Sequence, residues 1–248
     1  MASNKTVFIS GGASGIGYLC GECYAKEGAN VVLLDINEKA LNECVEKIKK
    51  ITDNVMGCVV DVLDYAQVER ARDEAVARFG SIDILIVTAG GAETRLKNAY
   101  APDFTEVDIE VVDFGLDLNL KGALHVDHAV MRQMAKQGSG VVVNLGSITG
   151  EEGCPVNVAY SASKSALMNG VVKSLAMCGG KHGIRAVCVA PGPVLTRPGM
   201  ANMKTLMGRA AETQEIVDMI MYVASDKGAF ITGTTILMDG GRNVLRNK

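Results

Sequence analysis

Short apolar runs alternate with longer amphipathic stretches along almost the whole chain. Seven of the runs have the length and continuous hydrophobicity of buried strands. They are Val7–Ser10, Val31–Leu34, Val55–Val60, Ile84–Val87, Val141–Leu145, Ala186–Ala190 and Thr235–Met238. Strands that are apolar at consecutive positions are covered on both faces, as the strands of parallel sheets are. The pattern therefore predicts a parallel sheet with helices on both sides.

Between these runs, apolar residues return every three or four positions, which is typical of helices with one buried face. The predicted helices are Ile16–Glu27, Glu38–Lys50, Ala66–Phe79, Glu110–Lys136, Val158–Cys178 and Gln214–Ala224. Alternating strands and helices, joined by right-handed crossovers, predict an α/β fold: a doubly wound parallel sheet of about seven strands.

The chain of 248 residues carries no linker, charge block or internal repeat, so we expect one domain over residues 1–248. Residues 193–212 form the longest segment without a strand or helix signal, and they include Pro198, Gly199 and three methionines. Unstructured segments of that length inside a domain are usually functional, so we expect a substrate lid; a mobile surface excursion is the alternative.

Composition narrows the class of protein. With 48% hydrophobic and 21% charged residues and a net charge of −3, the chain is not disordered and lacks the basic surface that nucleic acid requires. No apolar run reaches the ~18 residues of a membrane span, and residues 1–6 contain no apolar signal core. The seven cysteines are odd in number and irregularly spaced, which does not favour a framework of disulfide bonds. We expect a cytoplasmic protein without a nucleic-acid or membrane partner.

A glycine-rich loop follows the first predicted strand and opens the first helix, over Ser10–Gly17. Such a loop lets a diphosphate approach the amide groups at the helix N-terminus. Asp35 ends the second strand 18 positions beyond Gly17, where a carboxylate accepts hydrogen bonds from ribose hydroxyls. Together they predict a dinucleotide site, and Asp61 at the end of the third strand adds an acid on the adenine side.

The residues around Asp35 favour NAD(H) over NADP(H). A carboxylate at this position repels a 2′-phosphate, and the next residue is Ile36 instead of an arginine that would neutralise one. NAD is therefore the expected cofactor.

Tyr160 and Lys164 lie four residues apart, which places them one turn apart on the same face of a predicted helix. A neighbouring cation favours the phenolate, so such a tyrosine can exchange protons near neutral pH although its free pKa is about 10. The pair is a candidate for general acid/base catalysis.

Combined with Asn119 and with Ser147, thirteen residues before Tyr160, these motifs resemble the short-chain dehydrogenase/reductase family over essentially the whole chain. Further matching segments are Asp61-Val62, Ala89-Gly90, Asn144 to Ser147, Pro191-Gly192 followed by Thr196, Ile231-Thr232-Gly233 and Asp239-Gly240-Gly241. The resemblance implies a Rossmann fold and hydride transfer between a nicotinamide cofactor and a secondary alcohol or ketone.

The resemblance also implies a role for each residue. Tyr160 would be the general acid/base, Ser147 would hold the substrate oxygen, and Lys164 would bind the nicotinamide ribose and lower the pKa of Tyr160. Asn119 would interrupt its helix and hold a water, and Pro191 to Thr196 would hold the carboxamide. The expected cofactor-binding residues are Gly11, Ser14, Gly15, Ile16, Gly17, Asp35, Asp61, Val62, Ala89, Gly90, Tyr160, Lys164, Pro191, Gly192, Val194 and Thr196.

The chain departs from the family pattern at two places near the loop. Ser10 replaces the usual threonine and keeps its hydroxyl. Val87-Thr88 stand where the family has two asparagines, so an amide that braces the central sheet is missing and Thr88 is expected to replace only part of its hydrogen bonding.

The substrate stays open at this stage. Sugars, sugar acids, hydroxysteroids and other secondary alcohols all fit, and a 3-oxoacyl-thioester reductase and a catalytically silent NAD-binding regulatory protein are the alternatives. Candidate pocket residues are Glu93, Thr94, Arg95, Glu151, Glu152 and Cys154, although the charged members would equally suit a solvent-facing rim. We expect a homotetramer or dimer that pairs the helices around residues 119–136 and 160–178, where Leu124, Val130, Leu167, Val171 and Leu175 supply apolar area.

No metal site is expected. Cys20 and Cys23 fall inside the first helix without a second pair at ligand spacing, so we interpret them as packing residues. His125 and His128 lie one helical turn apart without a nearby acid, which favours subunit packing over metal binding.

Overall fold

The computed structural model describes residues 2–245. Residue 1 and residues 246–248 of the predicted domain lie outside the described part. Seven parallel strands form one sheet in the order β3-β2-β1-β4-β5-β6-β7. The strands are β1 (Thr6–Ser10), β2 (Asn30–Asp35), β3 (Val55–Val59), β4 (Ile84–Val87), β5 (Gly140–Leu145), β6 (Ile184–Pro191) and β7 (Thr234–Met238). The predicted doubly wound α/β fold is confirmed.

The longer helices correspond to the predicted periodic segments, with two of those segments divided. The helices are α1 (Gly15–Lys26), α2 (Glu38–Lys49), α3 (Tyr65–Phe79), α4 (Glu93–Leu96), α5 (Ile109–Leu116), α6 (Gly122–Gln137), α7 (Thr149–Glu152), α8 (Val158–Ala166), α9 (Val172–Gly180) and α10 (Thr213–Ala224). The short helices α4 and α7 are not predicted from the sequence. A π-helical turn, η2 (Asp117–Lys121), joins α5 to α6, and a second one, η3 (Leu167–Val171), joins α8 to α9. Hydrophobic periodicity does not reveal such a turn, because it leaves the same face buried.

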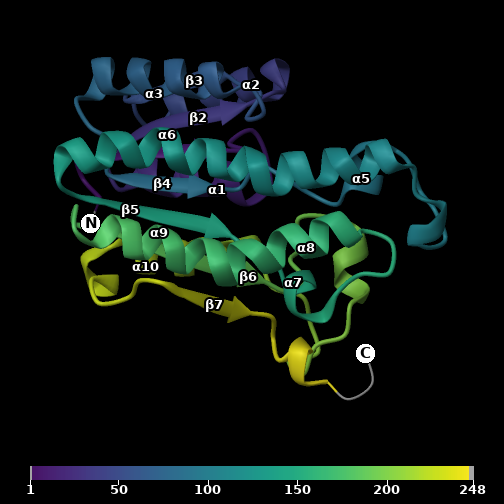
Figure 1. Cartoon of the computed structure of the whole chain (residues 1–248). Helices are drawn as coiled ribbons and strands as arrows, with labels where there is room; N and C mark the ends of the chain where they lie inside the picture. Colours follow the sequence, from purple (N-terminus) through teal and green to yellow (C-terminus); the bar gives the residue numbers. More distant parts are fainter. Residues whose placement is uncertain (1, 246–248) are drawn as a thin grey trace.

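Helices cover both faces of the sheet, and Figure 1 shows α6 and α9 in front of the strands. Side chains on β1 alternate between the two cores: Val7 and Ile9 pack with α1, α2 and α10, whereas Phe8 packs with α3 and α6. All five residues of β1 are buried, which accounts for the continuous hydrophobicity of its sequence. No helix among residues 2–245 is long and apolar enough to cross a membrane.

The chain reverses its winding direction between β1 and β4, which leaves a crevice at the carboxyl ends of these strands. Thr88 fastens this point, because its Oγ1 donates to the carbonyl oxygen of Ser10 at 2.6 Å while its backbone N–H donates to the same oxygen at 3.1 Å. One hydroxyl therefore joins the end of β4 to the end of β1, as expected of a partial replacement for an asparagine.

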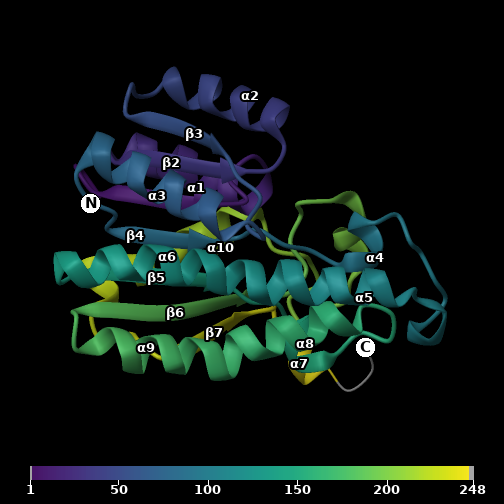
Figure 2. The same ribbon diagram turned by 45° about the horizontal axis from the view of Figure 1, so that its top comes forward.

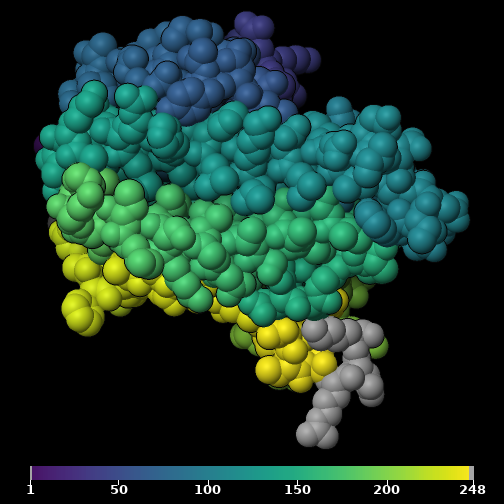
Figure 3. All heavy atoms as spheres, viewed as in Figure 1, coloured from purple at the N-terminus to yellow at the C-terminus, as the bar shows by residue number. Residues whose placement is uncertain are grey.

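Two excursions extend beyond the carboxyl ends of the strands. One follows β4 and contains α4 and a 3-10 turn, η1 (Phe104–Glu106); the other follows β6 and contains η4 (Pro198–Asn202). Figure 2 shows both at the same end of the molecule, and in the space-filling view of Figure 3 the first one projects from the body. The second excursion is closed at its base by paired backbone between Val194 and Ala211.

Candidate functional site

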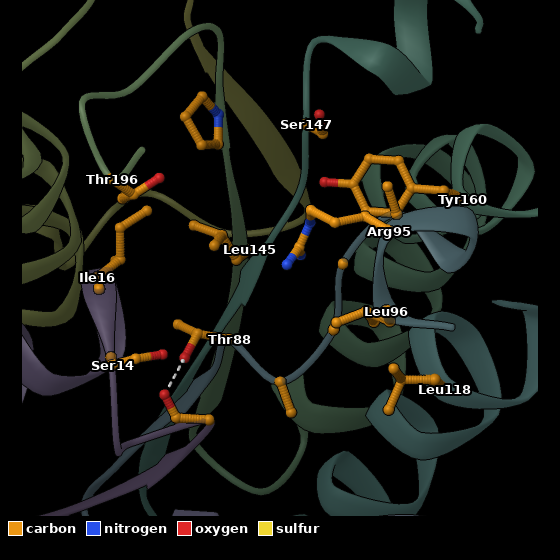
Figure 4. A pocket seen from close by; sticks show the side chains of 18 of the residues that line it. Ser14, Ile16, Thr88, Arg95, Leu96, Leu118, Leu145, Ser147, Tyr160 and Thr196 are labelled. Carbon is orange, nitrogen blue, oxygen red and sulfur yellow. Dashed lines mark hydrogen bonds between the residues drawn. The ribbon is translucent and has the colours of Figure 1, made fainter. Parts of the chain in front are cut away.

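A cavity of about 690 Å³ opens at the carboxyl ends of the strands, between the two excursions. Its lining includes all of the expected cofactor-binding residues except Lys164, and it also includes Ser147 (Figure 4). Lys164 and Asn119 are buried and do not line it. Segments that are far apart in the sequence therefore meet in one place.

The glycine-rich turn at one end of the cavity has two glycines, Gly11 and Gly15, with backbone conformations that disfavour a side chain. Gly11 has a φ of +71°, and a Cβ there would lie 2.7 Å from the backbone nitrogen of Ala89. Gly15, at φ +52°, begins α1, and the hydroxyl of the N-cap residue Ser14 makes no hydrogen bond to the first turn. The amides at this helix N-terminus are thus available to an anion in the cavity.

The carboxylate of Asp35 stands at the end of β2, beside this turn. Its Oδ2 accepts from the backbone N–H of Ala13 at 3.1 Å, and its Oδ1 accepts from that of Asn37 at 3.0 Å. Each carboxylate oxygen accepts more than one hydrogen bond, so capacity remains for a pair of ribose hydroxyls. The side chain of Ile36 is exposed, and Asp61 lies one strand further along. The residues present fit the adenosine and diphosphate parts of a dinucleotide.

Ser147, Tyr160 and Lys164 lie at the opposite end of the cavity. Figure 4 shows the hydroxyls of Ser147 and Tyr160 pointing into the same space. Beneath them Lys164 is 4% exposed; its Nζ donates to the carbonyl oxygen of Leu145 at 2.6 Å and lies 5.7 Å from the centre of the Tyr160 ring. The fold therefore brings together a hydroxyl donor, a phenol and a buried cation. The proximity of the phenol of Tyr160 to the cation of Lys164 is what their four-residue spacing predicts.

Asn119 lies in the π turn η2, so the long helix is interrupted where the family resemblance implies. Its Oδ1 accepts from the N–H of Gly91 at 2.8 Å, and its Nδ2 donates to the carbonyl oxygens of Gly91 and Gly115 at 3.0 and 2.9 Å. A Cβ at Gly90 would lie 2.5 Å from Asn119 Oδ1 and 4.0 Å from Lys164 Nζ. Asn119 thus lies next to Lys164 and fixes the segment after β4.

The short helix α4 makes contacts that the sequence does not reveal. Glu93 is fully buried, and its carboxylate oxygens accept from the backbone N–H groups of Ala159 and Tyr160, both at 3.2 Å. The Oγ1 of Thr94 donates to the side-chain oxygen of Asn157 at 2.8 Å. These three bonds tie α4 to the beginning of α8.

The expectation that all of residues 93–95 face the pocket is therefore wrong for Glu93 and Thr94. Of these three residues, only Arg95 lines the cavity, because successive side chains of a helical turn point in different directions. Glu151 is exposed, whereas Glu152 forms an ion pair with Arg242 at 2.9 Å, so neither belongs to the cavity lining. Cys154 does line it.

The two histidines and two cysteines considered as metal ligands make contacts within the chain, although His128 is exposed. His125 contacts the carbonyl oxygen of Val62 through Nδ1 at 2.9 Å, and His128 contacts the hydroxyl of Tyr65 at 2.6 Å. Cys20 is fully buried, as expected of a packing residue, whereas Cys23 is only half-buried and lies beside Gln214 of α10.

A carboxyl group is buried below the catalytic end. Asp127 on α6 is 1% exposed, and its Oδ2 accepts from Nδ2 of Asn144 at 3.0 Å. In the part of the chain that the structure describes, its Oδ1 and the side-chain oxygens of Asn144 and Ser163 have no hydrogen-bond partner. Burial raises the pKa of Asp127 to about 7, which the hydrogen bond from Asn144 opposes.

Comparison with known proteins agrees with this geometry. The model of the short chain dehydrogenase family matches residues 5–207. The chain belongs to the short-chain dehydrogenase/reductase family, whose members are oxidoreductases that use NAD(P). The family resemblance expected from the sequence is confirmed.

Three relatives illustrate the range of the family. The chain is 32% identical to the 3-oxoacyl-[acyl-carrier-protein] reductase FabG of Thermotoga maritima, over 96% of this chain and 97% of that one. It is 31% identical to the cis-4-hydroxycyclohexanecarboxylate dehydrogenase of Sinomonas cyclohexanicum, over 96% of each. A crystal structure of NAD⁺-bound xylitol dehydrogenase superposes with a TM-score of 0.86 at 25% identity, covering 96% of this chain and 99% of that one.

Proposed function

We propose that the protein is an NAD-dependent secondary-alcohol dehydrogenase or ketone reductase with Tyr160 as its general acid/base. The observation that carries the proposal is that the hydroxyls of Ser147 and Tyr160 face one cavity whose far end holds the glycine turn and Asp35 (Figure 4). The three relatives act on an acyl thioester, a hydroxycyclohexanecarboxylate and a polyol, which supports CH–OH chemistry and leaves the substrate open.

Each residue around the cavity has a separate role in the proposed reaction. When bound, NAD accepts or donates a hydride at the carbinol or carbonyl carbon. Ser147 hydrogen-bonds the substrate oxygen, and Tyr160 takes the hydroxyl proton during oxidation or returns it during reduction. The buried Nζ of Lys164 lies 5.7 Å from the centre of the Tyr160 ring and places a positive charge beside the reacting groups. Residues 193–212 serve as the lid that excludes water, hinged where Val194 pairs with Ala211.

Asp35 supports a preference for NAD(H) over NADP(H). Its carboxylate is held in place by two backbone amides, so it cannot easily withdraw from a 2′-phosphate, and no arginine follows it. The repulsion between two anions at hydrogen-bond distance then acts against NADP(H).

A 3-oxoacyl-thioester reductase stays the alternative enzyme, supported by the similarity to FabG. A silent NAD-binding protein is disfavoured, because Asn119, Ser147, Tyr160 and Lys164 are all present and adjoin one cavity. The test is a panel of secondary alcohols, polyols, hydroxy acids and a 3-oxoacyl thioester, screened for formation or consumption of NADH with NADP(H) alongside. Binding of NADH without turnover of any compound would contradict the enzyme proposal.

We also propose a homotetramer or dimer, formed through exposed apolar residues of the chain. Val130 and Leu167 are fully buried in the monomer, so the expectation that they contribute to an interface is wrong. Ile109, Leu116 and Leu124 remain exposed on α5 and α6. A second exposed set, Met177, Phe230 and Leu237, lies on α9 and around β7. Sedimentation at micromolar concentration should show an assembly larger than the monomer.

A further inference from the structure

One arginine at the catalytic end of the cavity has no anionic partner. Arg95 is half-buried, its Nε is fully shielded from solvent, and among residues 2–245 this nitrogen has no hydrogen-bond partner. Figure 4 shows its guanidinium pointing into the cavity, between Tyr160 and Leu145. Within residues 2–245 no carboxylate forms an ion pair with it. A guanidinium in this position has lost part of its hydration without an anion in return.

The local structure holds Arg95 in this orientation. Glu93 and Thr94 tie the first residues of α4 to α8, so the backbone that carries Arg95 is fixed. A Cβ at Gly91 would collide with Nη2 of Arg95, which shows that the guanidinium lies directly against the Gly91 backbone. The glycine at position 91 therefore provides the space that the arginine head occupies.

After burial, the largest effect on the pKa of Arg95 comes from another cation. Burial lowers the pKa of the Arg95 guanidinium, and the positive charge of Arg197 lowers it further, whereas Tyr160 and Tyr100 oppose both effects. Arg197 belongs to the lid segment and lines the same cavity. The two acids of the lining, Asp35 and Asp61, follow β2 and β3 at the adenosine end and accept from backbone amides there. Among the described residues, the cavity lining at the catalytic end thus contains two arginines and no acidic side chain. The buried charges of Lys164 and Glu93 lie behind this lining, where Lys164 bonds a backbone carbonyl and Glu93 bonds two backbone amides.

We propose that the substrate carries a carboxylate and that Arg95 binds it, with Arg197 of the lid contributing a second positive charge. The inference rests on the proposed function and narrows its substrate class to hydroxy acids and the corresponding oxo acids. Arginine suits this role because its planar fork pairs with both oxygens of a carboxylate. In the oxidation, the carbinol C–H hydride passes to NAD⁺, the hydroxyl proton passes to Tyr160, and the carboxylate stays unchanged.

The first test measures binding without turnover. Calorimetric titration of the NADH-loaded protein with butyrate and with butyramide compares a carboxylate with an uncharged group of the same shape. We expect butyrate to bind at least tenfold more tightly, and Arg95→Gln to abolish that difference. The control is Lys97→Gln, because Lys97 directly follows the same short helix, but its Nζ lies 3.9 Å from the centre of the Phe114 ring and outside the cavity lining. Equal binding of the two probes would overturn the proposal.

The second test uses turnover of matched substrates, namely a series of hydroxy acids and their methyl esters. Arg95→Gln should raise KM for the acids by about 10- to 100-fold, the cost of losing a charged hydrogen-bonded pair. KM for the esters should change less than threefold. If Arg95→Gln instead weakened NADH binding by the same factor in the absence of substrate, Arg95 would serve the cofactor diphosphate and the carboxylate proposal would be overturned.

The two proposals fail in different ways. A wild-type protein that binds no NADH would overturn both. A wild-type protein that oxidises neutral alcohols as well as acids, with Arg95→Gln showing no selective effect, would overturn only the carboxylate site.

Discussion

The carboxylate of Glu93 caps the helix that carries Tyr160. One of its oxygens accepts a hydrogen bond from the backbone N–H of Tyr160 and the other from that of Ala159. Negative charge at a helix N-terminus is stabilising, and here it is buried and satisfies two amides that the helix itself leaves unpaired. Glu93 is therefore a positioning residue for the phenol.

Replacing Glu93 should lower the rate without preventing cofactor binding. Glu93→Gln directs an amide NH₂ toward a backbone N–H, so the start of α8 should shift, and kcat should fall by about 10- to 100-fold. NADH affinity, which depends on the distant glycine turn, should stay within about threefold. The control is Glu151→Gln, an exposed glutamate on α7 at the same end of the molecule. A Glu93→Gln protein with normal kcat would refute the positioning role.

Tyr160→Phe should separate binding from chemistry. The substitution removes one oxygen and keeps the ring, so NADH should still bind while turnover falls by about 10²- to 10⁴-fold, as is typical of a lost general acid/base. Lys164→Met should instead lower both turnover and cofactor affinity, because Lys164 is the buried cation beside Tyr160 at this end of the cavity. Steady-state kinetics and fluorescence titration of NADH measure both effects. Near-normal turnover of Tyr160→Phe would show that the acid/base lies elsewhere.

The choice between the two cofactors should depend on Asp35. Wild-type protein should bind NADH at least tenfold more tightly than NADPH, and Asp35→Ala should narrow this ratio by removing the charge that repels a 2′-phosphate. Adding Ile36→Arg should narrow it further, because residue 36 is exposed beside the same site and an arginine there neutralises the phosphate. Fluorescence titration with both cofactors gives the ratio. A wild-type protein with equal affinities would contradict the prediction.

Asp127 should make the protein less stable as the pH rises. The pKa of its buried carboxyl is raised from 3.8 to about 7, so between these values the folded protein holds a proton that the unfolded chain releases. Stability from this group is full below pH 4 and is lost as the pH rises toward 7. Asp127→Asn stays neutral, so its free energy of unfolding relative to wild type should increase from pH 5 to pH 8, by an amount on the order of a few kcal/mol.

Urea unfolding of both proteins at the two pH values measures this difference. Asp113→Asn serves as the control, because Asp113 is exposed on α5 and its removal should not alter the pH dependence. A constant difference between Asp127→Asn and wild type across this range would refute the assignment of the pH dependence to Asp127.

The sequence predicts most of the fold because its signals are local. The continuous apolar runs identify every strand, and the glycine turn, Asp35 and the Tyr160/Lys164 pair identify residues whose spacing already places them at strand ends or on one helix face. Glu93 and Arg95 could not be placed in the same way. Their orientations depend on a single turn of helix held by residues some 65 positions away, and that contact leaves no periodic pattern. The π turns are hidden for the opposite reason, since they preserve the buried face of their helices.

The contacts of Asn119 with Gly91 make the two walls of the cleft mechanically unequal. On one side, hydrogen bonds of Glu93, Thr94 and Asn119 join α4, α8 and the π turn, so this wall behaves as one rigid block. The lid on the opposite side is held instead at its base, where Val194 pairs with Ala211, and by hydrogen bonds of Lys204 and Met207 with the segment after β7. Changes of sequence in the lid can therefore alter which molecules enter while the reacting groups keep their alignment, and new specificities should be obtainable by randomising residues 197–208 alone.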